Sequence, residues 1–196
     1  MCSSDLAPRI GLAAAERVNV DVEGDGLIFF NMGTNSLDVR LRQLGRLQAD
    51  GGLAEIRAQA RGSFADTVLN LDGIVQARGV ASRGGRIFVD GGTEGITDVR
   101  GTLDVTDAAA GGVGGQVAVL GNKVGLFDSA LLDASGAAGG GQLLVGGNFQ
   151  GKGPELNASA VYIGEGVRLK ADALEAGDGG RVIVWSDRST RYLGSI

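Results

Sequence analysis

Residues 132–148 read LDASGAAGGGQLLVGGN, and the way glycine alternates with short apolar runs in this stretch decides the fold. Six of its 17 residues are glycine. A stretch this rich in glycine can form a loop that binds phosphate through backbone N–H groups. It can also form the corners between short strands, and many such corners need a positive φ. The rest of the chain separates the two interpretations, because the same pattern returns at a regular spacing.

A short apolar motif recurs along the chain. It reads GRLQA, GIVQA, GTLDV, ALLDA and VRLKA, with anchors at Leu47, Val75, Leu103, Leu132 and Leu169. The anchors are 28, 28, 29 and 37 residues apart. The last four anchors are each followed by a glycine pair and an apolar run, as in GGRIFVDGG and GGQLLVGGN; the pairs are Gly84–Gly85, Gly114–Gly115, Gly140–Gly141 and Gly179–Gly180. A third strand-like segment, such as TVLNLDG or GITDVRG, precedes each anchor, so a unit of this length indicates a repeat architecture.

Three short apolar segments per unit predict an all-β fold, a right-handed parallel β-helix (solenoid) with three short strands per coil. One coil cannot bury its own apolar residues, but coils stacked about 4.8 Å apart pair each strand with its copies and form a continuous core. Parallel crossovers are right-handed in nearly all proteins, which gives the predicted hand. The residues predicted to point inward are Val75, Ile87, Val89, Leu103, Val117, Val119, Leu132, Leu143, Val145, Leu169, Val182 and Val184.

The repeats also predict the domain organisation. We expect residues 18–196 to form a single β-helix segment that is truncated at both ends, with DGLIFFNMG and LGRLQADGG fitting its earlier coils. Residues 1–17 match no repeat and are expected to be a poorly defined start that is not native sequence. The 37-residue spacing indicates an inserted loop around residues 149–164, and solenoid loops often carry binding.

Composition excludes several classes of protein. The 196 residues include 36 Gly, 2 Pro and 43% apolar residues, which is enough apolar material for a core. The chain has no His, and its one cysteine is Cys2, so the commonest general base, the commonest metal ligand and disulfides are all missing. A net charge of −5 argues against nucleic acid as a partner. No apolar run reaches the length of about 18 residues that a membrane span needs, so we predict no membrane insertion. Since His is missing and Cys2 is the one cysteine, we also predict no metal, and we predict no cofactor.

Two ligand-binding motifs match only in part. Gly146, Gly151 and Lys152 fit the opening of a phosphate-binding loop, but Gly153 stands where the Ser or Thr for magnesium belongs. Acidic residues gather in two places that invite comparison with calcium sites, namely Asp21, Glu23 and Asp25, and Asp172, Glu175 and Asp178. The glycine pairs lack the aspartate of calcium-binding nonapeptides, so we interpret these carboxylates as solvated corner residues.

Asp104 and Asp133 occupy equivalent positions in successive repeats, so they are expected to stack on one outer wall. A β-helical polysaccharide lyase or hydrolase would need such carboxylates together with a basic residue. The equivalent positions in other repeats are Gln48, Gln76 and Lys170, which is typical of a variable outward ladder. The enzyme therefore stands as an alternative, and no catalytic residue is assigned.

A carbohydrate-binding β-helix module is another alternative. Trp185, Tyr192 and Phe149 are candidates for a sugar-stacking surface beside Lys152, although a tryptophan that covers a glycine corner explains Trp185 equally simply. Asn157-Ala158-Ser159 is a formal glycosylation sequon within the predicted loop.

The run ALLDASG…GGG…VGGN, the loop FQGKGPELNAS and the closing run GDGGRVIVWSD resemble the β-helical shaft of filamentous-haemagglutinin-like exoproteins of the two-partner secretion pathway. The resemblance is clearest over residues 75–196 and looser from residue 18. The Asn-Pro-rich motifs N-P-N-G-I and N-P-N-L of that family's secretion domain are missing, and Asn31-Met32-Gly33 does not replace them. The resemblance therefore implies a shaft region downstream of the secretion domain.

This resemblance implies a non-enzymatic structural and adhesive segment of a large adhesin, secreted or attached to the surface of a Gram-negative bacterium. The implied partners are an outer-membrane β-barrel transporter, reached through a separate N-terminal domain, and glycans or proteins on host or bacterial surfaces. No binding residue is assigned from it.

Overall fold

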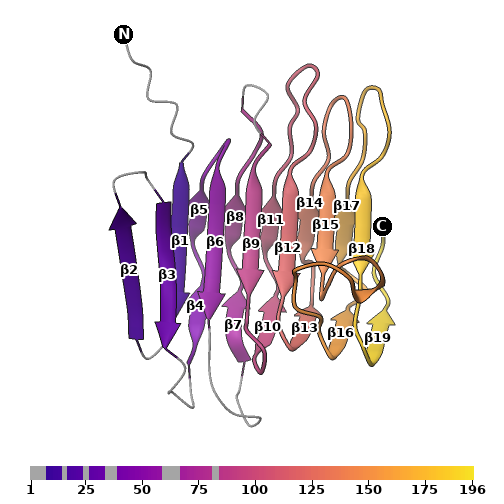
Figure 1. Cartoon of the computed structure of the whole chain (residues 1–196). Coiled ribbons are helices and arrows are strands. Elements are labelled where there is room, and N and C mark those ends of the chain that lie inside the picture. The colour runs from indigo at the N-terminus through magenta and orange to yellow at the C-terminus, as the bar shows by residue number, and fades with distance from the viewer. Residues whose placement is uncertain (1–7, 15–16, 24–26, 34–38, 59–66, 81–83) are drawn as a thin grey trace.

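The computed structural model describes residues 8–14, 17–23, 27–33, 39–58, 67–80 and 84–196. Within these ranges the chain winds as a parallel β-helix, in which each complete coil contributes one strand to each of three sheets (Figure 1). The predicted all-β class and the predicted three strands per coil are confirmed.

The three sheets form three walls, which we call sheets A, C and D. Sheet A contains β1 (Arg9–Ala14), β6 (Leu53–Ala58), β9 (Arg86–Asp90), β12 (Gln116–Leu120), β15 (Gln142–Val145) and β18 (Arg181–Val184). Sheet C contains β4 (Leu41–Gln43), β7 (Thr67–Leu71), β10 (Ile96–Val99), β13 (Lys123–Leu126), β16 (Ala160–Ile163) and β19 (Ser189–Tyr192). Sheet D contains β5 (Arg46–Gln48), β8 (Ile74–Gln76), β11 (Thr102–Asp104), β14 (Leu131–Asp133) and β17 (Arg168–Lys170).

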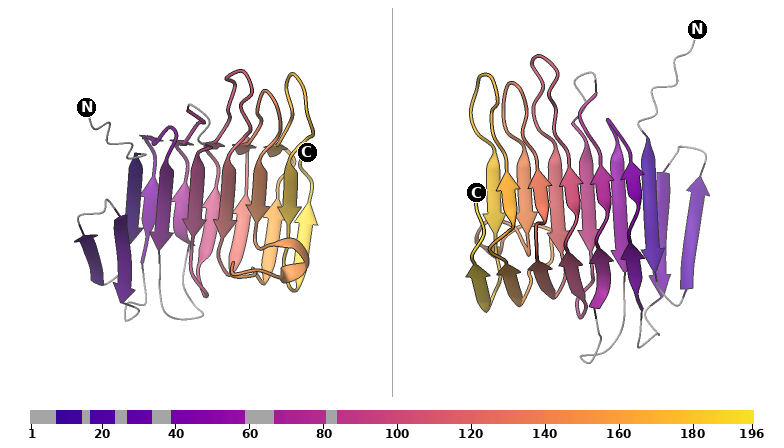
Figure 2. Two further views of the ribbon diagram at one scale, coloured as in Figure 1. Left: turned by 45° about the horizontal axis from the view of Figure 1, so that its top comes forward. Right: turned by 180° about the vertical axis from the view of Figure 1, so that it is seen from behind.

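The repeat motif sets the register of sheet D. Leu103 pairs with Val75 on one side and with Leu132 on the other, and Leu132 pairs in turn with Leu169. The five anchors found in the sequence therefore form one column through the helix. Figure 2 shows the parallel strands stacked along one axis, with an antiparallel pair, β2 (Arg17–Glu23) and β3 (Leu27–Gly33), at one end.

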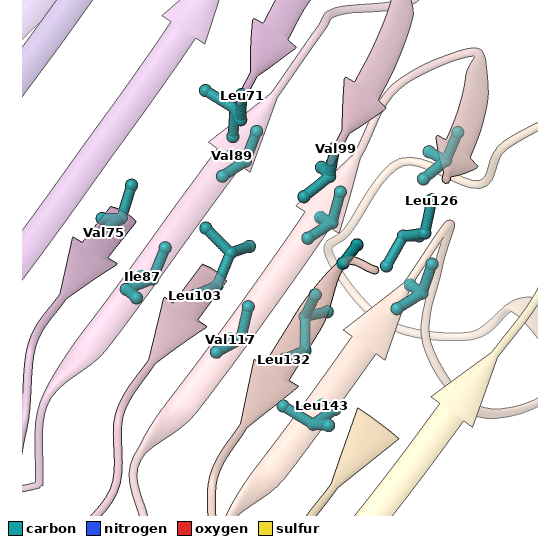
Figure 3. Close-up of a cluster of buried hydrophobic side chains, with 14 of the residues drawn as sticks. Leu71, Val75, Ile87, Val89, Val99, Leu103, Val117, Leu126, Leu132 and Leu143 are labelled. Carbon is teal, nitrogen blue, oxygen red and sulfur yellow. The ribbon is translucent and has the colours of Figure 1, made fainter. Parts of the chain in front are cut away.

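The interior of the helix is a continuous apolar core. Ten of the 12 residues predicted to point inward are at most 1% exposed; they are Val75, Ile87, Val89, Leu103, Val117, Val119, Leu132, Leu143, Val145 and Leu169. Figure 3 shows labelled members of this core converging from all three walls. Val182 and Val184 pack against the core but are only partly buried, because β18 is an edge strand of sheet A.

The second glycine of each pair is required by close stacking of the backbone. A Cβ atom on Gly115 would lie 2.2 Å from the carbonyl oxygen of Gly85, and one on Gly141 would lie 2.0 Å from that of Gly115. No member of the four pairs has a positive φ, so the expectation that these corners need left-handed backbone is wrong for them. Gly146, at the end of β15, does adopt a positive φ of 79° where the chain leaves the wall.

The N-terminal part differs from the prediction. β1 lies within residues 1–17 and pairs in parallel with β6, so the helix includes strand structure before residue 18. β2 (Arg17–Glu23) and β3 (Leu27–Gly33) form an antiparallel pair, so the coil predicted over DGLIFFNMG is wrong. The alternating run RVNVDVE followed by an Asp-Gly pair is a hairpin signal that outweighs the weaker repeat there.

The predicted inserted loop is present with other bounds. It spans residues 146–159, between β15 and β16, and contains a short 3₁₀ turn, η1 (Phe149–Gly151). Residues 160–163, which fall within the predicted loop, form β16 in sheet C. The sequence does carry a signal for this strand, since VYIGEGV matches the strand-like segment before each other anchor.

Candidate functional site

Function in a filled β-helix has to lie on its outer walls or in its loops, because apolar side chains occupy the interior. The residues that the sequence singles out are distributed over all three walls and the inserted loop.

The outer face of sheet D carries Asp104, and this carboxylate is fully engaged. Its Oδ2 accepts hydrogen bonds from Arg78 Nε at 2.7 Å and from Gln76 Nε2 at 3.1 Å. Its Oδ1 accepts from the backbone N–H of Thr106 at 3.0 Å and from its hydroxyl at 2.8 Å. Burial raises the pKa of Asp104, but the bonds from Thr106, Arg78 and Gln76 outweigh burial and hold the pKa below its ordinary value. Such a carboxylate is poorly suited to accept a proton as a general base.

Asp133 follows Asp104 in the same ladder and has a similar local role. The two residues are Cα partners in the pairing of β11 with β14. Asp133 Oδ1 accepts the backbone N–H of Ser135 at 3.0 Å, two residues on, as Asp104 accepts that of Thr106. A carboxylate that accepts the N–H two residues ahead closes an Asx turn, so these side chains shape the corners after β11 and β14.

Acidic residues do not gather into a metal cluster in the part of the chain that the structure describes; no group of three or more His, Cys, Asp or Glu lies at metal-binding distance there. Asp172, Glu175 and Asp178 are in this described part, and all three are exposed. Asp25 and the side chains of Asp21 and Glu23 lie outside it. The arrangement on sheet D thus offers ordered corners rather than a cluster of free carboxylates.

The outer face of sheet C carries two stacked aromatic rings, each with an arginine guanidinium over it. Phe127 and Tyr162 stack with their ring centroids 5.3 Å apart. The Arg100 guanidinium lies 4.9 Å from the Phe127 centroid, and that of Arg191 lies 6.0 Å from the Tyr162 centroid. Hydrogen bonds from Arg100 to Asp98 at 3.0 Å and to Asp128 at 2.8 Å raise the pKa of Arg100. The stacking joins residues of successive coils, so this row stabilises the wall across coils.

Part of the outer face of sheet A, over β12, β15 and β18, is covered by the inserted loop. Ala118, Leu120, Leu144 and Ile183 point away from the core yet are 0–7% exposed, and Phe88 and Trp185 pack against them. Outward side chains are buried only where something lies over them, and Figure 1 shows the loop after β15 crossing the front of this sheet. We call Ala118, Leu120, Leu144 and Ile183 the outer cluster.

Trp185 fixes the loop to the wall. Its indole N–H donates to Asp187 Oδ1 at 3.0 Å. Ideal Cβ positions on Gly147 and Gly151 would lie 3.1 Å and 2.8 Å from indole atoms of Trp185, so the loop glycines rest directly on the ring. The interpretation of Trp185 as a cover over a glycine corner is therefore supported by its contacts.

The residues proposed for sugar stacking are not brought together. Tyr192 packs against the main core, and burial raises the pKa of its hydroxyl. Trp185 belongs with the outer cluster, whereas Phe149 is 61% exposed in the loop.

The loop does not form a phosphate cradle. The N–H groups of Gly146, Gly151 and Lys152 donate to the carbonyls of Val119, Asn148 and Phe149. Lys152 Nζ donates to Gln150 Oε1 at 3.1 Å. The backbone N–H groups of the three motif residues are thus already used within the loop and wall.

Two side chains hold the loop closed. Asn148 Nδ2 donates to Glu155 Oε2 at 2.9 Å, and Asn157 Nδ2 donates to the carbonyl of Gly151 at 3.0 Å. The amide nitrogen of Asn157, which a glycan would be attached to in the sequon, thus has a structural role.

No helix in the described part of the chain is long and apolar enough to cross a membrane.

Comparisons with known proteins identify a fold but no family. No protein-family pattern matches the chain, and no curated protein matches it. The chain is similar to the crystal structure of the HMW1 secretion domain from Haemophilus influenzae, with a TM-score of 0.67 and 19% sequence identity. The match covers 97% of this chain and 57% of that domain, so the chain spans little more than half the length of the structure that it matches.

Proposed function

We propose that this chain is a non-enzymatic structural segment of a secreted β-helical protein, exported by a two-partner system. The single observation that carries the proposal is the fold itself, with its three-walled stack and its similarity over 97% of the chain to a secretion domain. The motifs ALLDASG and GDGGRVIVWSD, which resemble the filamentous-haemagglutinin-like shaft, add to it.

The mechanism that we propose is mechanical. Each inner strand of sheets A, C and D is paired with its copies above and below, and ion pairs such as that of Arg100 with Asp128 connect neighbouring coils. A stack held by backbone hydrogen bonds and a continuous core forms a stiff rod. Such a rod would hold loops or distal domains away from the cell surface, where they meet glycans or proteins of another cell.

A second candidate is that this segment itself takes part in secretion. It is favoured by the similarity to the HMW1 structure, which is a secretion domain rather than a shaft. On that view the chain would engage the outer-membrane β-barrel transporter directly, whereas a shaft segment would need a separate domain to do so.

Secretion of two fusions separates these candidates. The chain is placed directly behind a signal peptide, or behind a signal peptide and a known secretion domain, and each fusion is produced with and without the cognate transporter. A shaft segment reaches the medium only in the second fusion. Transporter-dependent release of the first fusion would favour the secretion role, and retention of both would overturn export by this route.

The absence of catalysis also belongs to this proposal. It is supported by the engagement of both Asp104 oxygens with Arg78, Gln76 and Thr106. Incubation of the purified chain with acidic and neutral polysaccharides, followed by a reducing-end assay, should show no cleavage. Cleavage that disappears in Asp104→Asn would instead establish the lyase or hydrolase alternative.

A further inference from the structure

A hollow on the outer face of sheet A lies beside the inserted loop and has a volume of about 270 Å³. Its wall residues come from three adjacent strands, β6, β9 and β12, together with Glu155 from the loop. Arg86 and Phe88 belong to the repeat motif GGRIFVDGG, but none of the ligand-binding candidates named from the sequence lines the hollow, and the structural role described above does not use it.

The register of sheet A explains why these side chains meet. Glu55 of β6 pairs with Phe88 of β9, which pairs with Ala118 of β12, so the three form one outward row. Arg86 and Gln116 are Cα partners in the row beside it. Residues far apart in sequence thus converge because the coils are stacked.

The floor of the hollow is apolar and its rim is polar with both signs of charge. Leu53, Phe88 and Ala118 provide apolar surface. The Arg57 guanidinium lies 5.1 Å from the Phe88 ring centroid and forms an ion pair with Glu55. The Nε atom of Arg57 is buried and has no hydrogen-bond partner. The rim thus carries two cations, Arg57 and Arg86, and two anions, Glu55 and Glu155, so its formal charges sum to zero.

The rim is also held in place. Glu155 Oε2 accepts a hydrogen bond from Asn148 within the closed loop, and Gln116 Nε2 donates to Gln142 Oε1 of the next coil at 3.3 Å. Fixed donors and acceptors lose little conformational entropy when a ligand binds, which favours affinity.

We propose that this hollow binds a neutral saccharide. A sugar ring has an apolar C–H face that suits the floor formed by Leu53 and Phe88, and hydroxyl groups that suit carboxylate, guanidinium and amide groups at the rim. The cancelled charge disfavours a strongly anionic glycan, and the volume suits one or two sugar rings. The site is independent of the proposed role in export.

Titration of the purified chain with cellobiose, lactose and N,N′-diacetylchitobiose tests the proposal, with sialyllactose as the acidic comparison. Isothermal calorimetry and NMR chemical-shift mapping should show binding of at least one neutral disaccharide, with shifts at Phe88 and Gln116, and weaker binding of sialyllactose. Loss of a charged hydrogen-bonding group predicts roughly tenfold weaker binding for Arg86→Met and for Glu155→Gln.

Arg168→Met is the matched control, because Arg168 is an exposed arginine on β17 of sheet D, away from the hollow. It should bind with unchanged affinity, and circular dichroism should show that all three variants fold. The proposal is overturned if no neutral disaccharide binds at millimolar concentration, or if Arg86→Met and Glu155→Gln bind as tightly as the native chain. Neither result bears on the secretion experiment.

Discussion

Leu132→Ala probes the stacked core at its centre. Leu132 is completely buried in the anchor column, between Leu103 of one coil and Leu169 of the next. The substitution removes three buried carbon groups, worth about 2.4 kcal/mol at about 0.8 kcal/mol each. The neighbouring strands are held by their backbone ladders, so the cavity cannot collapse fully. We therefore expect a loss of about 3–5 kcal/mol in the free energy of unfolding.

Leu47→Ala is the matched control at the other end of the same column. Leu47 lies on β5, an edge strand of sheet D, and is only partly buried. The same chemical change there should cost about 1–2 kcal/mol, because part of the side chain already meets solvent. Urea unfolding followed by far-UV circular dichroism measures both losses, and the slopes of the native chain and the variants should agree. An equal or larger loss for Leu47→Ala would refute the stacked-column reasoning.

Three further predictions concern the corners, the charges and the loop. Gly115→Ala should lower the free energy of unfolding by about 1–3 kcal/mol, because its Cβ would lie 2.2 Å from the Gly85 carbonyl oxygen. For Gly84→Ala the nearest contact of the new Cβ is 3.7 Å, so the free energy of unfolding in the same urea assay should change by no more than about 0.5 kcal/mol. The pKa of Asp104 is lower in the folded chain than its ordinary value of 3.8, so its contribution to stability is complete above that value and is lost as the pH falls through the folded pKa. The stability difference between the native chain and Asp104→Asn, measured by thermal unfolding, should therefore be constant near neutral pH and shrink below about pH 4; a difference that grows on acidification would contradict this sign. Replacing residues 148–157 with a short Gly-Ser turn should uncover the outer cluster around Leu144 and increase binding of the dye ANS, and unchanged dye binding would show that the loop does not shield sheet A.

Much of the fold was accessible from sequence because the repeat encodes it directly. The spacing of Val75, Leu103 and Leu132 predicted the register of sheet D, since equivalent residues of successive coils must pair. The inward residues followed from the period-2 alternation of strands, as in Ile87 and Val89. A local pattern was sufficient wherever one coil repeats the next.

The features that sequence did not reveal depend on contacts outside the repeat. Leu144 looks like any outward strand residue, and only the path of the inserted loop explains why it is fully buried. The hollow beside Glu155 depends on the same path, because a loop residue meets three strands of an earlier part of the chain. The hairpin of β2 and β3 carried an Asp-Gly signal that could have been recognised.

The charged ladder on sheet D shows why equivalent positions do not imply shared chemistry. Asp104 and Asp133 stack as the sequence indicated, but each accepts a backbone N–H two residues ahead. The corner, rather than a substrate, accounts for an aspartate at these places.

Export by the proposed route is tested most directly by localising the protein in the cells that produce it. Antibody against this chain would be applied to cytoplasmic, surface and medium fractions of cells with and without the outer-membrane transporter. Export by a two-partner system predicts signal at the surface or in the medium that depends on the transporter. Signal confined to the cytoplasm in both strains would contradict it.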